Sequence, residues 1–333
     1  MIDPSSRVPL GATSVTATRL ALGTAPIGKI FDAGSEERSQ ASLRRAFELG
    51  VRFFDTAPLY GFGLAEERLG RFLRTVPRDD VVVATKVGRL LRADAPPDPR
   101  RATDPATWAG APALNWVFDF SYDGVMRSLE ESLARLGTDR VDVLHIHDPD
   151  DHEEQALSGA FKALRKLREE GTIGAVGSGM NQAAMLARFA RAAEFNCFLL
   201  AGRYSLLDHE TAVTSLLPIC VERNVSIIIG GVYNSGILAN PVAGAPFNYE
   251  PAPAPWLDRA QRIKAVCDRH GVPLMAAAIQ FPLAHPAVAT VLSGVRTPAE
   301  IEENHQMMQF PIPAGLWTDL RSAGLIHPEA PTP

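Results

Sequence analysis

The stretch FFDTAPLYGFG, residues 53–63, begins as an apolar strand and ends as a glycine-containing loop. Its carboxylate, Asp55, falls where the strand changes into the loop, and Tyr60 follows in the loop. Apolar residues supply most of what surrounds Asp55, so a charge at this position needs a partner. The rest of the chain repeats the same change from strand to loop to helix, and this repetition predicts the fold.

Eight stretches are short, apolar and rich in β-branched residues, as strands buried on both faces of a sheet are. They are residues 18–24, 51–56, 80–88, 141–147, 171–179, 197–202, 225–231 and 288–294. Amphipathic helical patterns lie between them. The first of these begins with Ser35 as its N-cap and ends at Gly50, and later ones end at Gly137 and Gly171.

Eight strands alternating with helices, without a break in composition, predict an α/β fold. The expected architecture is one (β/α)8 TIM barrel domain over residues 1–333. A doubly wound open sheet is the alternative, but the first strand is not followed by G-x-G-x-x-G. Two connections, residues 89–120 and 232–255, are long and rich in proline. Both follow strands, so they should lie as lids or binding loops over the C-terminal face. An extra C-terminal helix is expected within residues 313–325.

The overall composition is that of an ordinary globular protein, with 46% hydrophobic and 21% charged residues and a net charge of −5. This balance favours neither nucleic acid nor an anionic membrane as a partner. The three cysteines are far apart and form no CxxC. No apolar run approaches the roughly 18 residues of a transmembrane helix, and the N-terminus has no signal-peptide core. We therefore expect a cytoplasmic protein; its oligomeric state stays open.

Charged side chains mark the C-terminal ends of the early strands. Lys86 lies near the end of the third strand and His147 at the end of the fourth, so both come close to Asp55 in a barrel. An Asp55–Lys86 ion pair would satisfy both charges, although such a pair could serve only to hold two strands together. A nearby ammonium would lower the pKa of Tyr60 from about 10 and make the phenol a proton donor and acceptor. With a neutral hydrogen bond from His147, the group suits hydride transfer at a carbinol carbon.

Residues 53–61, 81–89 and 139–150 resemble the aldo-keto reductase superfamily, and the likeness extends along nearly the whole chain. The superfamily's catalytic tetrad falls on Asp55, Tyr60, Lys86 and His147. Within the superfamily the chain looks like the branch of D-threo-aldose 1-dehydrogenase and L-fucose dehydrogenase, which also contains pyridoxal 4-dehydrogenase. The resemblance implies NAD(P)-dependent oxidation of an aldose at its anomeric carbon to the lactone, with Tyr60 as acid and base. Pyridoxal oxidation to 4-pyridoxolactone, general aldehyde reduction and a non-enzymatic binding role are the alternatives.

The resemblance also implies a dinucleotide extended across the barrel mouth, and it marks the residues that would contact it. Gly23, Thr24 and Asp55 would lie near the nicotinamide, and Ser178 and Asn181 would contact its carboxamide. Gly230 stands where many members have a stacking aromatic, for which Tyr204 or Tyr233 could substitute. The adenosine end would involve Ser293, Gly294, Arg296, Glu300, Glu303 and Asn304.

The cofactor expected from this end of the site is NAD, with NADP possible. A carboxylate at Glu300 would repel a 2′-phosphate and could accept from a ribose hydroxyl. Arg296 could instead bind the phosphate, and Glu300 could be an ordinary first-turn acid that complements the helix dipole.

Aromatic residues around the mouth predict where a substrate ring would bind. Ile30 and Phe31 in the first loop, and Trp108, Trp116 and Phe118 in the second, would line the site together with Tyr60 and His147. Flat aromatics suit the apolar face of a pyranose and would stack equally well on a pyridine ring.

The pair His145 and His147 offers a rival interpretation, because a His-x-His pair on a strand can begin a metal site. A metal-dependent barrel hydrolase would need more ligands at other strand ends. The remaining histidines fall in helices, loops or the tail. We therefore expect no metal and place His145 in the second layer of the barrel.

Overall fold

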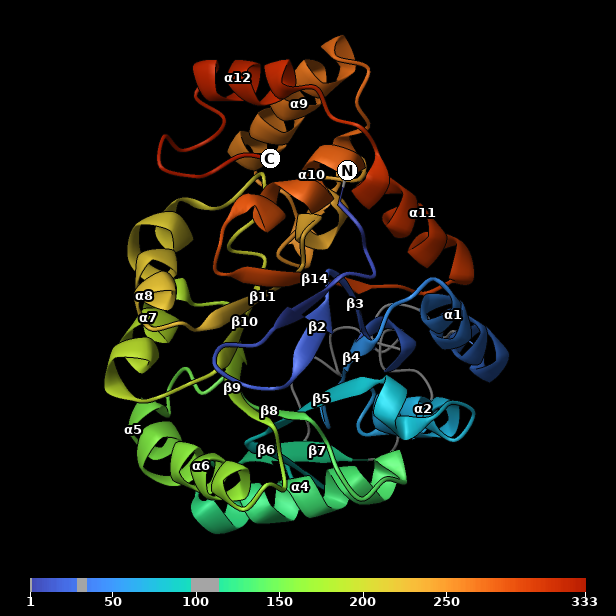
Figure 1. The fold of residues 1–333 in the computed structure, drawn as a ribbon, viewed down its shortest axis with the longest axis vertical. Helices are drawn as coiled ribbons and strands as arrows, with labels where there is room; N and C mark the ends of the chain where they lie inside the picture. The colour runs from blue at the N-terminus through green and yellow to red at the C-terminus, as the bar shows by residue number, and fades with distance from the viewer. Residues whose placement is uncertain (1, 29–34, 97–113) are drawn as a thin grey trace.

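The computed structural model describes residues 2–28, 35–96 and 114–333, and its centre is a closed barrel of eight parallel strands (Figure 1). Each barrel strand pairs with the next one along the chain, and the last pairs with the first. The strands are β3 (Leu20–Gly23), β4 (Phe53–Asp55), β5 (Val82–Val87), β8 (Val143–His147), β9 (Ala175–Met180), β10 (Cys197–Ala201), β11 (Ser226–Gly230) and β14 (Val288–Gly294). All eight overlap the predicted stretches. The (β/α)8 fold is confirmed, and the open sheet is excluded.

Helices surround the barrel on its outside (Figure 1). They are α1 (Glu36–Glu48), α2 (Leu64–Leu73), α4 (Tyr122–Leu136), α5 (Glu153–Gln155), α6 (Phe161–Glu169), α7 (Ala183–Ala192), α8 (Leu217–Glu222), α9 (Ala254–Arg269), α10 (Leu274–Gln280), α11 (Pro298–Gln309) and α12 (Ala314–Ser322). The Ser35 hydroxyl accepts from the backbone N–H of Arg38, as the predicted N-cap should. Gly137 ends α4 at φ +62°, a conformation that favours glycine. The predicted extra C-terminal helix is α12, which packs beside α9.

Alternation along the strands divides the core into two layers. Ala21, Phe53, Ala84 and Val143 belong to a cluster that fills the barrel. The neighbouring residues of the same strands, such as Phe54, belong to a larger cluster packed under the helices. Side chains at the C-terminal end of the inner layer therefore point into the barrel mouth.

An antiparallel ribbon that the sequence did not predict closes the opposite end of the barrel. It consists of β1 (Arg7–Pro9) and β2 (Thr16–Thr18). Leu10 between the two strands is fully buried in the inner cluster. The backbone N–H of Gly11 donates to the hydroxyl of Ser226, the first residue of β11, at 2.8 Å. The β1–β2 ribbon thus covers the N-terminal end of the barrel interior.

Both long connections follow C-terminal strand ends, where they were predicted. The two ends of the first connection, β6 (Arg89–Arg92) and β7 (Asn115–Phe118), pair as an antiparallel ribbon. The second contains the short helix η5 (Asn234–Gly236) and a hairpin of β12 (Pro246–Phe247) with β13 (Glu250–Pro251).

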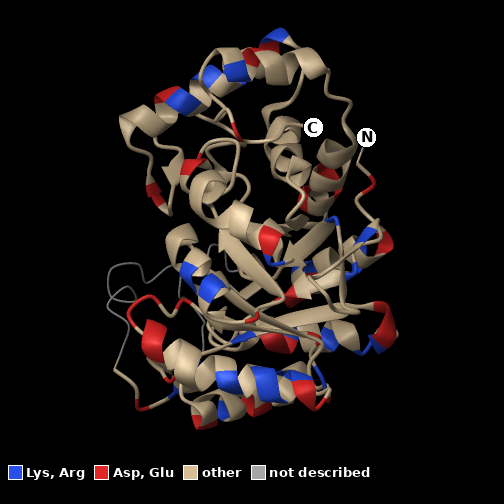
Figure 2. Cartoon of the chain, turned by 60° about the vertical axis from the view of Figure 1, so that its left-hand side comes forward, with Lys and Arg blue, Asp and Glu red and all other residues tan. Residues whose placement is uncertain are grey.

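Acidic and basic residues are interspersed along the outer helices in the view of Figure 2. This mixture agrees with the small net charge of −5 and gives no single-sign face in that view. Among the helices that the structure describes, none combines the length and the apolar content needed to cross a bilayer.

Candidate active site

The structure brings the four tetrad residues together at the open end of the barrel. Asp55 and His147 are the last residues of β4 and β8, and Lys86 lies in β5. Lys86 Nζ donates to Asp55 Oδ1 at 2.5 Å and to the carbonyl oxygen of Thr56 at 2.8 Å. Both side chains of the pair are only 1% exposed. The expected ion pair is therefore present and buried.

Tyr60 reaches the pair from a tightly folded loop after β4. Its backbone N–H donates to the carbonyl of Ala57, and Gly63 N–H donates to that of Pro58. The loop lies directly against Gly28, because a Cβ on Gly61 would stand 2.1 Å from the Gly28 carbonyl oxygen. Only glycine fits at such an approach. The backbone of the loop thus fixes where the Tyr60 ring lies.

The Tyr60 ring packs between the lysine and the histidine. Lys86 Nζ lies 4.7 Å from the ring centroid. The ring of His147 meets it edge-on, with centroids 6.0 Å apart and an interplanar angle of 87°. A substrate oxygen at the Tyr60 hydroxyl would therefore also lie near the imidazole, as acid–base catalysis with a second hydrogen bond requires.

The expectation of a lowered pKa for Tyr60 is wrong. Burial raises the pKa of this phenol to about 12, and the carboxylates of Asp55 and Asp148 add to the increase. Lys86 lowers the pKa but does not outweigh the burial. The sequence predicts which charged residues lie near Tyr60 but not how completely the fold buries the phenol. Tyr60 is therefore protonated at neutral pH in this structure.

Lys86 and His147 carry the charges that were expected. Burial lowers the pKa of Lys86, but Asp55 and Tyr60 more than compensate, so the pKa lies above its ordinary value. Burial lowers the pKa of His147 well below its ordinary range, and Arg89 and Lys86 lower it further. The imidazole is therefore neutral, and it can donate a hydrogen bond without adding a second positive charge.

His145 lies one layer deeper in the barrel, as predicted. It is fully buried beside Lys86 in the β5–β8 register, and burial lowers its pKa to about 3. Its partner across β9 is Gly177, where a Cβ would stand 2.2 Å from His145 Nδ1. In the part of the chain that the structure describes, no cluster of three or more histidine, cysteine or acidic side chains could hold a metal ion.

Three buried polar atoms around the mouth are suited to a bound cofactor. Thr24 Oγ1, Asp55 Oδ2 and His147 Nδ1 are inaccessible to solvent, and the described residues offer them no hydrogen-bond partner. Thr24 and Asp55 are adjacent, since the Thr24 N–H donates to the Asp55 carbonyl at 2.9 Å. Buried polar groups normally find partners, so a ligand with hydroxyl or amide groups fits this place.

The prediction for Ser178 is wrong, because its side chain does not face the mouth. Side chains at Gly177 and Gly179 would point inward, toward His145 and Lys86, so Ser178 between them points outward. Its hydroxyl is fully buried and donates to the Ile146 carbonyl at 3.1 Å. Asn181 lies two residues after the inward-facing Gly179, just beyond β9, and is partly exposed. Its contact with the carboxamide stays a prediction.

Tyr204 is also excluded as the stacking aromatic. It has no exposed surface and packs against Phe281 and His285, with ring centroids 5.5 and 5.9 Å away. Tyr233, in the loop that follows β11, is a partly exposed residue and stays the predicted stacking aromatic. Gly230 itself packs closely, and a Cβ there would meet Leu199 at 3.3 Å.

The predicted adenosine end lies at the N-terminus of α11. Arg296 donates to Glu300 Oε1 through Nε at 3.0 Å and Nη2 at 2.7 Å, and its backbone N–H donates to Oε2. The Thr297 hydroxyl caps the helix by accepting from the Glu300 N–H. Gly294 and Glu303 are exposed nearby. The arginine is thus engaged with Glu300 and not extended toward a phosphate.

Asn304 has internal partners for its amide. It accepts from the Tyr233 hydroxyl and donates to the Ser293 hydroxyl, both at 2.8 Å, and it is 4% exposed. The three side chains tie β14 and α11 to the loop after β11. Contacts of Ser293 and Asn304 with adenosine stay predictions.

An aromatic wall borders the mouth on the side of β6 and β7. Trp116 stacks on Phe62 at 5.8 Å, and Phe118 is 44% exposed. The guanidinium of Arg89 lies 5.5 Å from the Trp116 ring and 4.9 Å from the Phe118 ring. Three other predicted substrate or lid residues lie outside the described residues: Ile30, Phe31 and Trp108. Sequence reasoning missed Arg89 and its partner Asp148, although Asp148 directly follows the tetrad histidine.

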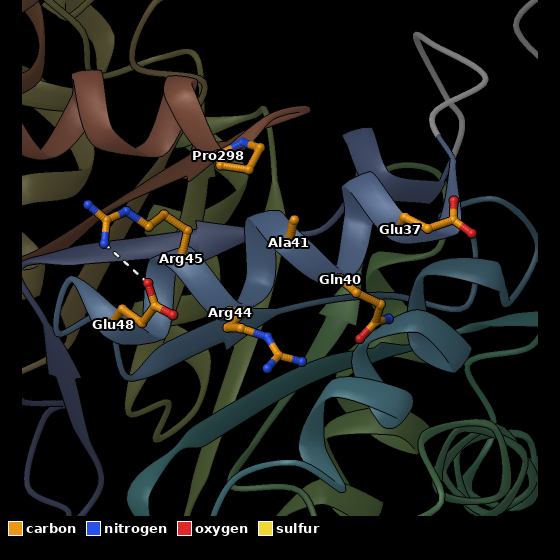
Figure 3. Close-up of a pocket in the computed structure, with 7 residues that line it drawn as sticks. All are labelled: Glu37, Gln40, Ala41, Arg44, Arg45, Glu48 and Pro298. Carbon is orange, nitrogen blue, oxygen red and sulfur yellow. Dashed lines mark hydrogen bonds and ion pairs between the residues drawn. The ribbon is translucent and has the colours of Figure 1, made fainter.

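A hollow on the outer face of α1 is separate from this site (Figure 3). Its lining comes from one side of α1 and from Pro298 at the start of α11, and it contains no tetrad residue. Arg45 there pairs with Glu48 and Glu302 at 3.1 and 2.6 Å. This hollow therefore lies apart from the acid–base groups at the barrel mouth.

Comparisons with known proteins identify the family of the chain. The sequence profile of the Aldo/keto reductase family matches residues 19–324. Pyridoxal 4-dehydrogenase of Microbacterium luteolum is 42% identical over 98% of this chain and 99% of that protein. D-threo-aldose 1-dehydrogenase of Pseudomonas sp is 42% identical over 97% of each. The aldo-keto reductase AKR11C1 from Bacillus halodurans, in its holo form, has the same fold, with a TM-score of 0.76 at 24% identity over 97% of both chains. The chain belongs to the aldo/keto reductase family of oxidoreductases, whose dehydrogenases use nicotinamide cofactors to act on small molecules.

Proposed function

We propose that this chain is an NAD-dependent dehydrogenase that oxidises an aldose at its anomeric carbon to the lactone. The observation that carries the proposal is the 42% identity, over nearly the full length of both chains, to a D-threo-aldose 1-dehydrogenase. The buried Asp55–Lys86 pair beside Tyr60 and His147 supports it, because these groups handle a proton and offer no nucleophile.

The tetrad supplies the proton chemistry. The C1 hydroxyl would lie between Tyr60 and His147, where the neutral imidazole orients its oxygen by a hydrogen bond. Tyr60 first releases its own proton to solvent, and Lys86 stabilises the phenolate that forms. This phenolate accepts the hydroxyl proton as the C–O bond becomes a carbonyl. Thr24 and Asp55 would hold the nicotinamide, whose chemistry when bound would be acceptance of the hydride. The two electrons and the proton that leave the sugar are thereby accounted for.

Pyridoxal is the second candidate substrate. The chain is equally similar to a pyridoxal 4-dehydrogenase, and the Phe62–Trp116 stack could face a pyridine ring as readily as a sugar. We would screen L-fucose, D-arabinose, L-galactose and pyridoxal with NAD at mildly alkaline pH and follow the absorbance of the reduced cofactor. Turnover of a sugar supports the proposal, and turnover of pyridoxal alone refutes it. If none of the four reacts but simple aldehydes are reduced, the enzyme is a general aldehyde reductase.

The preference for NAD rests on Glu300. Its carboxylate lies in the first turn of α11, where it would repel a 2′-phosphate, and it holds Arg296 by two hydrogen bonds. We expect kcat/KM to be larger with NAD than with NADP, and Glu300→Arg to narrow or invert that ratio. Glu302→Arg is the matched control, because it changes the charge equally on the α1 side of the same helix. A wild-type enzyme that prefers NADP would contradict this assignment.

A further inference from the structure

We propose that Asp148, held in place by Arg89, binds the hydroxyl group on the carbon next to the reacting carbon and thereby selects hydroxylated substrates. This inference rests on the proposed oxidation of an aldose. It adds to the tetrad a residue that determines specificity, and it explains a local conformation that the tetrad alone does not require.

The backbone at Asp148 is unusual for a residue other than glycine. Its φ is +43°, in the left-handed region, where Asp is tolerated better than most side chains but at a cost. Its N–H still donates to the Gly179 carbonyl at 3.0 Å, so the residue remains attached to the sheet. The turn therefore occurs immediately after His147. It brings the carboxylate back beside the imidazole, with Asp148 Oδ2 3.5 Å from His147 Nε2.

Arg89 fixes the direction of that carboxylate. Its Nη2 donates to Asp148 Oδ2 at 2.8 Å, and its side chain is 10% exposed against the rings of Trp116 and Phe118. The arginine is thus held by the aromatic wall while it holds the aspartate. Among the described residues, none donates a hydrogen bond to Asp148 Oδ1, and the side chain keeps 29% of its surface exposed. One carboxylate oxygen therefore remains available to a substrate.

The distance between Asp148 and His147 is too long for a hydrogen bond and suits two neighbouring substrate oxygens. The reacting oxygen would lie at Tyr60 and His147, and the next oxygen would then fall at Asp148. An ionised carboxylate only accepts hydrogen bonds, so it requires a hydroxyl and gains nothing from a ring ether oxygen. In a cyclic aldose the anomeric carbon is bonded to the ring ether oxygen on one side and to C2, which carries a hydroxyl, on the other. The geometry therefore points to the C2 hydroxyl.

The test compares Asp148→Asn with wild type on substrate pairs that differ only in this hydroxyl. The first pair is L-fucose and 2-deoxy-L-fucose, followed as oxidation with NAD. The second pair is lactaldehyde and propanal, followed as reduction with NADH. Asp142→Asn is the matched control, because Asp142 accepts from Arg78 at the same 2.8 Å but precedes β8, at the closed end of the barrel.

We expect wild type to prefer the hydroxylated member of each pair, and Asp148→Asn to lose about 10- to 100-fold in kcat/KM for that member only. Asp142→Asn should leave both ratios unchanged. Equal losses on both members of a pair would show a purely structural role and would overturn the proposal, as would a wild type without preference. If sugars fail while the preference for lactaldehyde over propanal disappears in Asp148→Asn, the proposed aldose oxidation is wrong and the role of Asp148 stands.

Discussion

Lys86→Met should destabilise the fold at neutral pH much more than at pH 5. Methionine keeps the length of the side chain but leaves the Asp55 carboxylate buried at 1% exposure without its cation. Removing one member of a buried pair costs about 3–5 kcal/mol. Asp55 can limit this cost by taking up a proton. For a carboxyl with the ordinary pKa of 3.8, the free energy needed to protonate it is about 4 kcal/mol at pH 7 and about 1.6 kcal/mol at pH 5.

The sign of the pH dependence follows from proton binding. Burial already raises the pKa of Asp55 in the folded wild type, and the loss of Lys86, whose charge opposes this rise, raises it further above the value in the unfolded chain. The folded state then binds more protons between these two values, so its stability falls as the pH rises through them. The free-energy loss relative to wild type should therefore be about 2–3 kcal/mol larger at pH 7 than at pH 5. Asp55→Asn/Lys86→Met removes both charges and should lose this pH dependence.

Urea unfolding followed by tryptophan fluorescence at both pH values measures these free energies. Lys166→Met is the matched control, because Lys166 donates to Glu170 at the same 2.5 Å while both side chains are half exposed. It should leave the free energy of unfolding nearly unchanged at either pH, because solvent screens an exposed ion pair. A loss for Lys86→Met that is equal at pH 7 and pH 5, or a double variant no more stable than Lys86→Met at pH 7, would refute the buried ion pair.

Three further predictions concern the acid–base groups. Tyr60→Phe should reduce kcat by at least about a hundredfold with an unchanged urea midpoint, and near-normal turnover would exclude Tyr60 as the proton carrier. Burial raises the pKa of Tyr60 to about 12, so only a small fraction of the enzyme carries a phenolate between pH 7 and pH 9. The kcat/KM for oxidation should therefore rise about tenfold per pH unit in this range. A kcat/KM that does not change with pH would exclude the phenolate as the base. The pKa of His145 is about 3 in the folded protein and about 6.5 in the unfolded chain, so the protein loses stability as the pH falls below 6.5. In His145→Leu, the free energy of unfolding lost between pH 7.5 and pH 5.5 should be about 1.3 kcal/mol smaller than in wild type. An equal loss in the two proteins would contradict the buried neutral ring.

The barrel could be predicted from the sequence because strands buried on both faces leave unbroken apolar runs, and all eight runs became barrel strands. The N-terminal ribbon of β1 and β2 could not. Its strands have three residues each, too few for a period of two to be recognised. The π-helical segments Ala156–Ala160 and Ala212–Leu216 were not predicted, because single-turn π-helices are rare and no residue type marks them in a sequence.

In the site, the sequence predicted which residues meet but not how they are oriented or solvated. Asp55, Lys86 and His147 follow from strand order alone, since neighbouring barrel strands bring their ends together. Ser178 was misplaced because a shift of one residue along a strand moves a side chain to the opposite face. The pKa of Tyr60 was misjudged because burial depends on the whole surrounding fold. Tyr204 was misjudged for the same reason.

The glycines of β9 explain how the barrel can contain the long polar side chains of Lys86, His145 and His147. In register, His145 lies opposite Gly177 and His147 opposite Gly179, and a Cβ at Gly179 would contact Lys86 Cε at 3.7 Å. The long side chains from β5 and β8 therefore occupy space that β9 leaves empty. Burial in that space keeps both histidines neutral, so Lys86 is the only cation among them. The field that stabilises a phenolate at Tyr60 thus comes from one charge whose position the barrel fixes.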